Sequence, residues 1–172
     1  MTQDATYSSD IPIVLSTNSD CELVDGLGTD ANNTTHERGA MNYNVSPGWS
    51  KLSNVWDAMY SIIENANLIV EGINKSSLLT SGDSDQRAME RFKGEALTIR
   101  AMVYFDLIRL FGDIPYKSES SNPDLSNVYL GKSDRDVIMD ELIKDLETAI
   151  TLLPWAGEVS AYTTERVTKG YA

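Results

Sequence analysis

The stretch from Glu95 to Pro115 reads EALTIRAMVYFDLIRLFGDIP and carries the strongest helical pattern in the chain. Its apolar residues fall on two adjoining stripes with helical spacing, which predicts a helix with a wide buried face. The first stripe begins just before this stretch and comprises Phe92, Ala96, Ile99, Val103, Leu107 and Leu110. The second comprises Leu97, Ala101, Tyr104, Ile108 and Phe111. Gly112 favours a helix stop, and the residue before Pro115 is pushed out of the helical conformation. The helix is therefore expected to end near Phe111.

An earlier helix is predicted from Lys51 onward, where apolar residues again repeat at helical spacing. Gly72, Asn74 and the Ser-rich stretch up to Asp85 are expected to end it. Its apolar positions are Val55, Met59, Ile62, Ala66, Ile69 and Ile73.

A later helix is predicted between Ser133 and Pro154. Ser133 is expected to cap it, and Asp136 places negative charge at the positive end of the helix dipole. Its apolar face consists of Ile138, Leu142, Leu146, Ala149 and Leu153. A fourth helix is expected over residues 165–172, with Thr164 as its cap.

Residues 1–50 are rich in Ser, Thr, Asn, Asp and Gly and are interpreted as mostly ordered loop. The chain is therefore predicted to be all-α, with one domain over residues 1–172 that joins the loop-rich segment 1–50 to a helical part, 51–172. Helices of about 20 residues joined by long loops favour a helical-repeat array over a compact four-helix bundle.

The charge of the chain argues against several classes of function. Its 172 residues include 14 basic and 26 acidic ones, a net charge of −12, which repels nucleic acid and anionic lipid. No apolar run approaches the roughly 18 to 20 residues of a membrane helix, and no charged segment followed by an apolar one opens the chain. Cys21 follows polar residues, unlike a lipoprotein anchor. Cys21 and His36 are the only Cys and His, which excludes a disulfide framework and a His/Cys zinc site.

Several motifs favour structure over chemistry. The segment 26–31, GLGTDA, fits a dinucleotide-binding pattern but is followed by no helical period, so a glycine-rich loop is favoured. The set Asp25, Asp30, Asn32 and Glu37 fails the EF-hand spacing, and no metal site is predicted. The single histidine has no nucleophile motif around it, which leaves a catalytic triad unsupported.

Charged residues on the helices are expected to be structural. Glu95, Arg100, Asp106 and Arg109 interrupt the apolar stripes, so any of them that is buried should be paired. The acidic pairs of the later helix, Asp136 with Asp140 and Glu141 with Asp145, are interpreted as a solvated acidic face.

Four segments, in order, resemble motifs of the SusD/RagB family, the outer-membrane glycan-binding lipoproteins of Bacteroidetes. Residues 95–115 fit the pattern E-A-x-x-x-R-A-x-x-Y-F-D-L-x-R-L-F-G-D-I-P of its most recognisable segment. The three others are Trp56-x-x-x-Tyr60-x-x-Ile63-x-x-x-Asn67, Asp145-Leu146-x-x-Ala149-x-x-x-Leu153-Pro154, and Arg166-Val167-Thr168-Lys169-Gly170.

The resemblance implies a tetratricopeptide-like scaffold that needs no cofactor and performs no catalysis. It implies oligosaccharide capture at the outer face of the outer membrane by a lipid-anchored protein, with delivery to a SusC-like TonB-dependent transporter. It also implies that this chain is an N-terminal fragment. Two alternatives are a helical-repeat module that binds a protein and no sugar, and a glycosidase, which would need two facing carboxylates in a cleft.

The aromatic residues are the candidates for sugar contact, because flat rings stack on sugar faces while neighbouring polar groups bind hydroxyls. For the case that this chain contributes to sugar contact, Trp49 is predicted as the stacking platform, with Asp30 and Tyr43 as polar partners, because all three lie in the irregular segment. Trp56 is expected to pack in the core. A tryptophan that seals the edge of a core is the commoner arrangement, and it is the interpretation favoured for Trp49 and Trp155.

Overall fold

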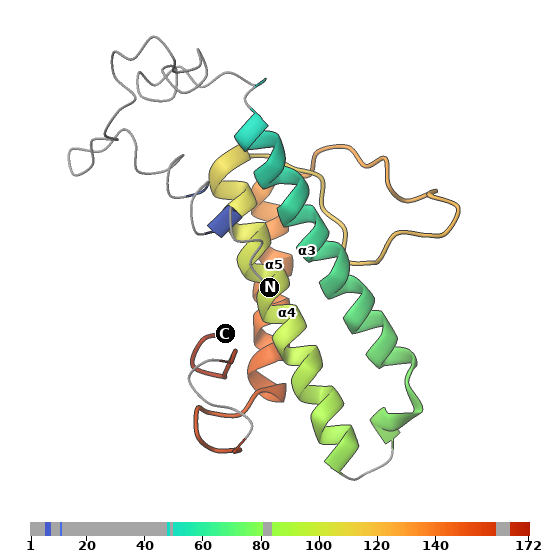
Figure 1. Cartoon of the computed structure of the whole chain (residues 1–172), viewed down its shortest axis with the longest axis vertical. Coiled ribbons are helices and arrows are strands. Elements are labelled where there is room, and N and C mark those ends of the chain that lie inside the picture. The colour runs from blue at the N-terminus through green and yellow to red at the C-terminus, as the bar shows by residue number, and fades with distance from the viewer. Residues whose placement is uncertain (1–5, 8–10, 12–47, 49, 81–83, 161–165) are drawn as a thin grey trace, which may run out of the picture. The chain divides into compact units, whose positions relative to one another are not determined.

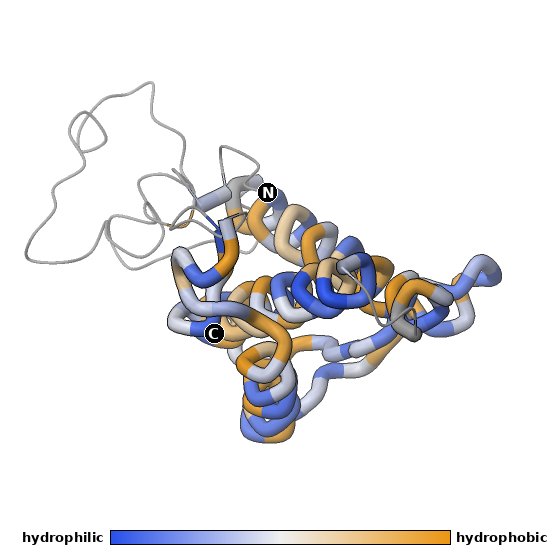
Figure 2. The backbone as a smooth tube through the Cα atoms, turned by 90° about the horizontal axis from the view of Figure 1, so that it is seen from below, coloured by the Kyte–Doolittle hydropathy of each residue, from blue (hydrophilic) through white to orange (hydrophobic). Residues whose placement is uncertain are grey.

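The computed structural model describes residues 6–7, 11, 48, 50–80, 84–160 and 166–172. Along these residues the elements are α3 (Ser50–Lys75), the short 3-10 helix η2 (Ser77–Thr80), α4 (Ser84–Phe111) and α5 (Arg135–Leu152). Among the residues described no strand is present. Figure 1 shows the three long helices and the connections between them, and Figure 2 shows apolar and polar residues alternating along each helix. The prediction of an all-α fold is confirmed.

The chain divides into two compact units, Met1–Tyr60 and Ser61–Ala172. In the first unit, the opening turns of α3 bury Val55, Ala58 and Met59. Trp56 is half-buried, and its ring centroid lies 4.8 Å from that of Tyr60, one helical turn later. The arrangement of residues 1–172 as a single domain stays a prediction.

In the second unit, three helices share one core. Ala66 and Val70 from α3 pack with Ala96 and Leu97 from α4 and with Ala149 from α5. The α4 helix is buried along much of the two predicted stripes, where the side chains of Val103, Tyr104 and Leu107 are fully inaccessible to solvent, although Phe92 near its start is 40% exposed. The close approach of α5 explains Gly94, because a Cβ atom there would lie 2.9 Å from Cγ of Leu153.

The ends of α4 and α5 follow the expected chemistry with one correction. Gly112 ends α4 with a φ of 73°, and its N–H donates to the Ile108 carbonyl at 2.9 Å, as its predicted role as a stop requires. The cap of α5 is Asp134 and not Ser133, since the Asp134 carboxylate accepts from the N–H of Asp136 at 2.8 Å. Ser133 instead donates its own N–H to the carbonyl of Ile114.

This Ile114–Ser133 bridge closes the base of the long connection between α4 and α5. Figure 1 shows that connection as an orange trace that swings away from the helices and returns. Ile114, at its beginning, is completely buried, whereas residues 122–126 are exposed. The connection therefore has a fixed base and a projecting tip.

The expected fourth helix is wrong where the chain is described. Residues 166–172 form turns, in which the N–H groups of Tyr171 and Ala172 both donate to the carbonyl of Thr168. Lys169 donates its N–H to the carbonyl of Pro154, and Val167 and Ala172 pack on the shared core. Packing against the end of α5 thus replaces helical continuation. Thr164 and Glu165 lie outside the described residues.

Candidate functional site

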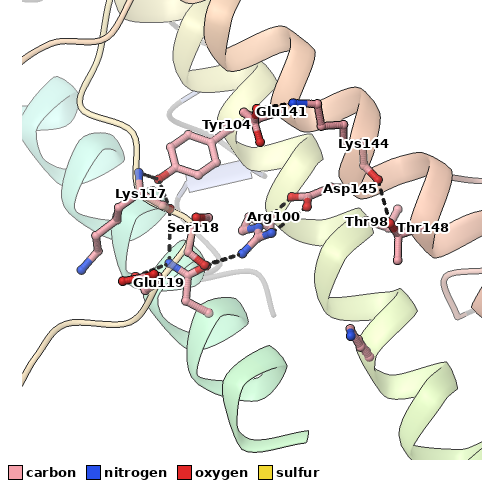
Figure 3. A network of polar contacts seen from close by, with 12 residues as sticks. Thr98, Arg100, Tyr104, Lys117, Ser118, Glu119, Glu141, Lys144, Asp145 and Thr148 are labelled. Atoms are coloured by element: carbon pink, nitrogen blue, oxygen red, sulfur yellow. Dashed lines mark hydrogen bonds and ion pairs between the residues drawn. The ribbon is translucent and has the colours of Figure 1, made fainter. Parts of the chain in front are cut away.

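Arg100 is the centre of a buried polar network that joins α4 to its neighbours (Figure 3). Its side chain is 5% exposed and forms a two-pronged ion pair with Asp145 of α5, with Nε–Oδ2 at 2.8 Å and Nη2–Oδ1 at 2.7 Å. Its Nη1 donates to Oδ1 of Asn67 on α3 at 2.7 Å and to the carbonyl of Ser118 at 3.0 Å. The planar guanidinium fits such a fork of acceptors. One side chain therefore binds three separate parts of the second unit.

Asn67 and Tyr104 extend the network to the backbone of the α4–α5 connection. The Asn67 amide donates to the carbonyl of Glu119 at 2.9 Å. The Tyr104 hydroxyl donates to the carbonyl of Lys117 at 3.0 Å and accepts from the Lys117 N–H at 3.1 Å. Burial raises the pKa of Tyr104 to about 12, so the hydroxyl remains a neutral donor and acceptor at physiological pH.

Two glutamates of α3 hold the next residues of the connection. Glu71 accepts from the N–H of Ser120 and Glu64 from that of Ser121, each at 2.6 Å. Burial acts to raise the pKa of Glu64, but hydrogen bonds from Lys117 and Ser121 outweigh it and leave that pKa below its ordinary value. The backbone hydrogen bond from Ser120 likewise lowers the pKa of Glu71. Both groups are thus held as acceptor-only carboxylates.

A second two-pronged ion pair joins α4 to the end of the chain. Arg166 donates from Nε and Nη2 to the carboxylate of Glu95 at 2.8 and 2.7 Å. The Arg166 guanidinium also lies over the ring of Phe92, 5.6 Å from its centroid. The prediction that Glu95 and Arg100 are paired is therefore confirmed, and Asp106 and Arg109 pair with each other within α4.

The expectation for Asp145 is wrong, and three anchors of the connection were not predicted. Asp145 was expected on a solvated face but is 14% exposed, because it faces Arg100. Asn67, Glu64 and Glu71 were not predicted as anchors of the connection. The buried face of α3 contains Ile63 and Val70, whereas Ile69 of the predicted stripe is 47% exposed. A signal for Asn67 is its place on that face, four residues after Ile63 and three before Val70.

Two apolar grooves flank α4 in the second unit. The first, of about 460 Å³, lies between α3 and α4 and is lined mainly by Leu68, Ile69, Phe92 and Ile99. The second, of about 380 Å³, lies between α4 and α5 and is lined mainly by Met102, Phe105, Met139, Ile143 and Tyr171. Among the described residues, the one carboxylate that lines either groove is Glu95, which is paired with Arg166. The described residues therefore place no two facing carboxylates, as glycoside hydrolysis needs, in these grooves.

The predicted sugar-contact residues Trp49, Asp30 and Tyr43 lie outside the described residues, as do the residues of segment 26–31. Trp155 is described, and the expectation that it seals a core edge is wrong. It is 58% exposed, with Lys169 Nζ 5.9 Å from the centroid of its ring and Gly170 against it. Across the parts of the chain that are described, no group of three or more His, Cys, Asp or Glu side chains is placed to hold a metal ion.

Comparison with known proteins identifies the family of the chain. Residues 13–171 match the SusD-like family model described as starch-binding, associating with the outer membrane. The chain belongs to the SusD-like family. Two SusD-like proteins of Formosa agariphila, P25 and P2, are both 29% identical to it, over 105 and 117 residues. These matches cover 61% and 66% of the chain but 19% and 21% of the relatives, so it spans about a fifth of their length.

Solved SusD-like structures share the fold. A SusD homologue from Bacteroides thetaiotaomicron superimposes with a TM-score of 0.80 at 24% identity, over 97% of this chain and 30% of that one. A laminarin-binding SusD-like protein gives 0.63 at 23% identity, over 83% and 29%. Surface glycan-binding protein A from Bacteroides fluxus gives 0.63 at 18% identity, over 99% and 38%. The prediction of a tetratricopeptide-like SusD fold is confirmed.

The SusD-like motifs in this chain meet at the two ion pairs. Arg100 and Glu95 come from the α4 motif, Asn67 from the α3 motif, Asp145 from the α5 motif and Arg166 from the last one. The segments by which this chain resembles the family thus include residues that join its α3, α4, α5 and C-terminal segment to one another. Function has to be argued from other parts of the molecule.

Proposed function

We propose that the whole protein captures an oligosaccharide at the cell surface and delivers it to a SusC-like TonB-dependent transporter, without catalysis and without a cofactor. The observation that carries the proposal is the match of residues 13–171 to a family described as starch-binding and associating with the outer membrane. Two neighbours of similar fold, a laminarin-binding SusD-like protein and a surface glycan-binding protein, support the choice of a glycan as ligand.

The proposed location is the extracellular face of the outer membrane, with a lipid anchor in the whole protein. The family description supports association with that membrane. No helix in the described part of the chain is long and apolar enough to cross a bilayer. The net charge of −12 opposes nucleic-acid binding, so the proposed partners are a sugar and a protein.

Sugar contact within this chain is proposed for Trp49, Asp30 and Tyr43. The polar side chains of the Arg100 network bond to one another and to the α4–α5 backbone, so they are poor candidates for binding sugar hydroxyls. This supports the assignment indirectly. Replacement of Trp49 by Ala should weaken glycan affinity by about 1 to 3 kcal/mol if the ring stacks on a sugar, by analogy with base stacking on aromatic rings. Unchanged affinity with a lower melting temperature would assign Trp49 to packing.

Isothermal titration of the whole protein tests the proposal. Laminarin, starch and a panel of plant and host glycans are the probes, and saturable heat with at least one of them is expected. The Trp155→Ala variant is a control for loss of an exposed tryptophan elsewhere in the chain, and should retain glycan affinity. Absence of binding across the panel would contradict glycan capture.

A second candidate function is a helical-repeat module that binds a protein partner and no sugar. The grooves beside α4 favour it, because both are lined almost entirely by apolar side chains. The two candidates are distinguished by measuring transporter binding and glycan binding on the same protein. A protein that forms a transporter complex but binds none of the glycans would fit the second candidate only.

A further inference from the structure

The tip of the α4–α5 connection, residues 122–130, presents apolar side chains to solvent. Tyr129 is 95% exposed and Leu125 is 58% exposed, and Val128 and Leu130 are also exposed. No charged residue occurs from Leu125 to Gly131, although the chain as a whole carries a net charge of −12. Exposed apolar side chains gathered in one short segment are typical of interaction sites.

The tip projects from a base that is fixed at several points. The Ile114–Ser133 bridge joins the two ends of the connection. Arg100 binds the Ser118 carbonyl, and Glu64 accepts from the Ser121 N–H directly before the tip. A segment that is held before it meets a partner loses less conformational entropy on binding than a free loop does.

Hydrogen bonds within the tip engage its polar side chains. The Asn127 side chain accepts from the N–H of Asn122 at 2.8 Å and donates to the carbonyl of Ser120 at 2.8 Å. Asn122 donates from its amide to the hydroxyl of Ser126, and Asp124 accepts from the Ser126 N–H. Sugar hydroxyls would have to compete with these bonds, whereas the apolar side chains face no such competition.

The backbone at Leu125 is strained in a way that fits a functional tip. Its φ is 59°, a left-handed conformation that is sterically unfavourable for a residue other than glycine. Such strained residues gather at binding and active sites. The Leu125 residue with this backbone conformation is 58% exposed.

We propose that the tip, residues 122–130, is a protein-docking element that inserts Leu125, Val128, Tyr129 and Leu130 into an uncharged apolar pocket of a partner. A protein fits better than a glycan, because three of these four side chains are aliphatic and cannot stack on a sugar ring as an aromatic does. The inference rests on the proposed function in one respect, since that function makes the transporter the partner.

The test compares transporter recovery by three forms of the tagged whole protein, purified in mild detergent from the outer membrane of its own host. They are the wild type, the tip variant Tyr129→Ser/Leu130→Ser, and the control variant Val137→Ser/Ile150→Ser. The control also removes two exposed apolar side chains, but from α5. The amount of SusC-like transporter per mole of bait is measured by mass spectrometry, together with the melting temperature and the affinity for laminarin and starch.

The expected result is a loss of transporter recovery of at least about tenfold for the tip variant alone, as for an aromatic residue at the centre of an interface. Equal recovery by the wild type and the tip variant would overturn the inference and leave the proposed function standing. Lost glycan affinity with normal transporter recovery would also overturn it, and would make the tip a sugar site. A wild type that recovers no transporter would overturn both. The single change Tyr129→Ser repeats the test if the double variant unfolds.

Discussion

The connection between α4 and α5 contains two regions with opposite chemistry. Residues 117–121 are polar and are held against the helices by Arg100, Tyr104, Glu64 and Glu71. Residues 122–130 are rich in exposed apolar side chains and bond mainly within their own segment. The usual arrangement has apolar groups inside and polar groups outside. Residues 122–130 depart from this arrangement, whereas residues 117–121, of which Ser120 is buried and Ser118 and Glu119 are exposed, are anchored to the helices by hydrogen bonds. The anchored region is therefore expected to contribute to stability, and the apolar tip is the region proposed for docking.

The largest expected effect comes from removing Arg100, the centre of the polar network that anchors residues 117–121. Arg100→Met should lower the free energy of unfolding by about 3 to 5 kcal/mol, because it leaves the carboxylate of Asp145 buried without its partner. Urea titration measures the loss. The exposed Arg109→Met variant of the same helix is the control and should change it by less than about 1 kcal/mol.

A second variant separates the cost of the unpaired Asp145 carboxylate from other effects of replacing Arg100. Arg100→Met/Asp145→Leu removes both charges and should recover part of the lost stability, because apolar replacement of a whole buried pair is often close to neutral. An Arg100→Met protein with an unchanged melting temperature but no partner binding would contradict the structural role of Arg100.

A smaller effect is expected from removing the hydrogen bonds between Tyr104 of α4 and the backbone of the α4–α5 connection. Tyr104→Phe removes only the hydroxyl that bonds both backbone groups of Lys117. The free energy of unfolding should fall by about 1 to 3 kcal/mol, the cost of leaving buried polar groups unsatisfied. Amide exchange at Lys117 should quicken in the variant. Unchanged exchange would show that the other anchors hold the base without Tyr104.

Much of the scaffold could be predicted from the sequence, because it depends on local patterns. The stripes on α4 predict its burial, Gly112 predicts its end, and the charges at Glu95 and Arg100 predict ion pairs. The partners Asp145 and Asn67 could not be assigned from the sequence alone, because pairing between helices depends on how they are rotated and displaced in the folded core.

Two local expectations failed because tertiary contacts changed the outcome. Ser133 is a good cap residue, but its backbone pairs with Ile114 and the carboxylate of Asp134 caps α5. A helix over residues 165–172 was expected because Thr164 is a good cap residue, yet Lys169 bonds to Pro154 and residues 166–172 form turns. Residues 117–132 are predicted as a polar loop containing Pro123, but the apolar side chains exposed at the tip were not predicted, because the segment LSNVYL has no period that marks it as an interaction site.

Relief of the backbone strain at Leu125 is expected to stabilise the protein, in contrast to the variants above. Leu125→Gly should raise the free energy of unfolding by up to about 1 kcal/mol, because glycine adopts a φ of 59° without steric cost while its greater freedom in the unfolded chain offsets part of the gain. Leu130→Gly, in the same tip, is the matched control and should not stabilise the protein. A destabilised Leu125→Gly protein would mean that the Leu125 side chain contributes contacts that stabilise the fold.

The smallest expected effect is a dependence of stability on pH that separates Glu64 from the rest of the acidic surface. Its pKa lies below the ordinary value of 4.5 in the folded protein, so the unfolded chain takes up the proton first as the pH falls. The stabilisation is therefore present above about pH 4.5 and is lost as the pH falls through the lowered pKa, with a size of at most about 1 kcal/mol for a partly exposed ion pair. The free energy of unfolding between pH 6 and about pH 3 should fall less in Glu64→Gln than in the wild type, whereas the exposed Glu147→Gln control should follow the wild type. Parallel curves for wild type and Glu64→Gln would show that the bonds from Lys117 and Ser121 position the connection without stabilising it.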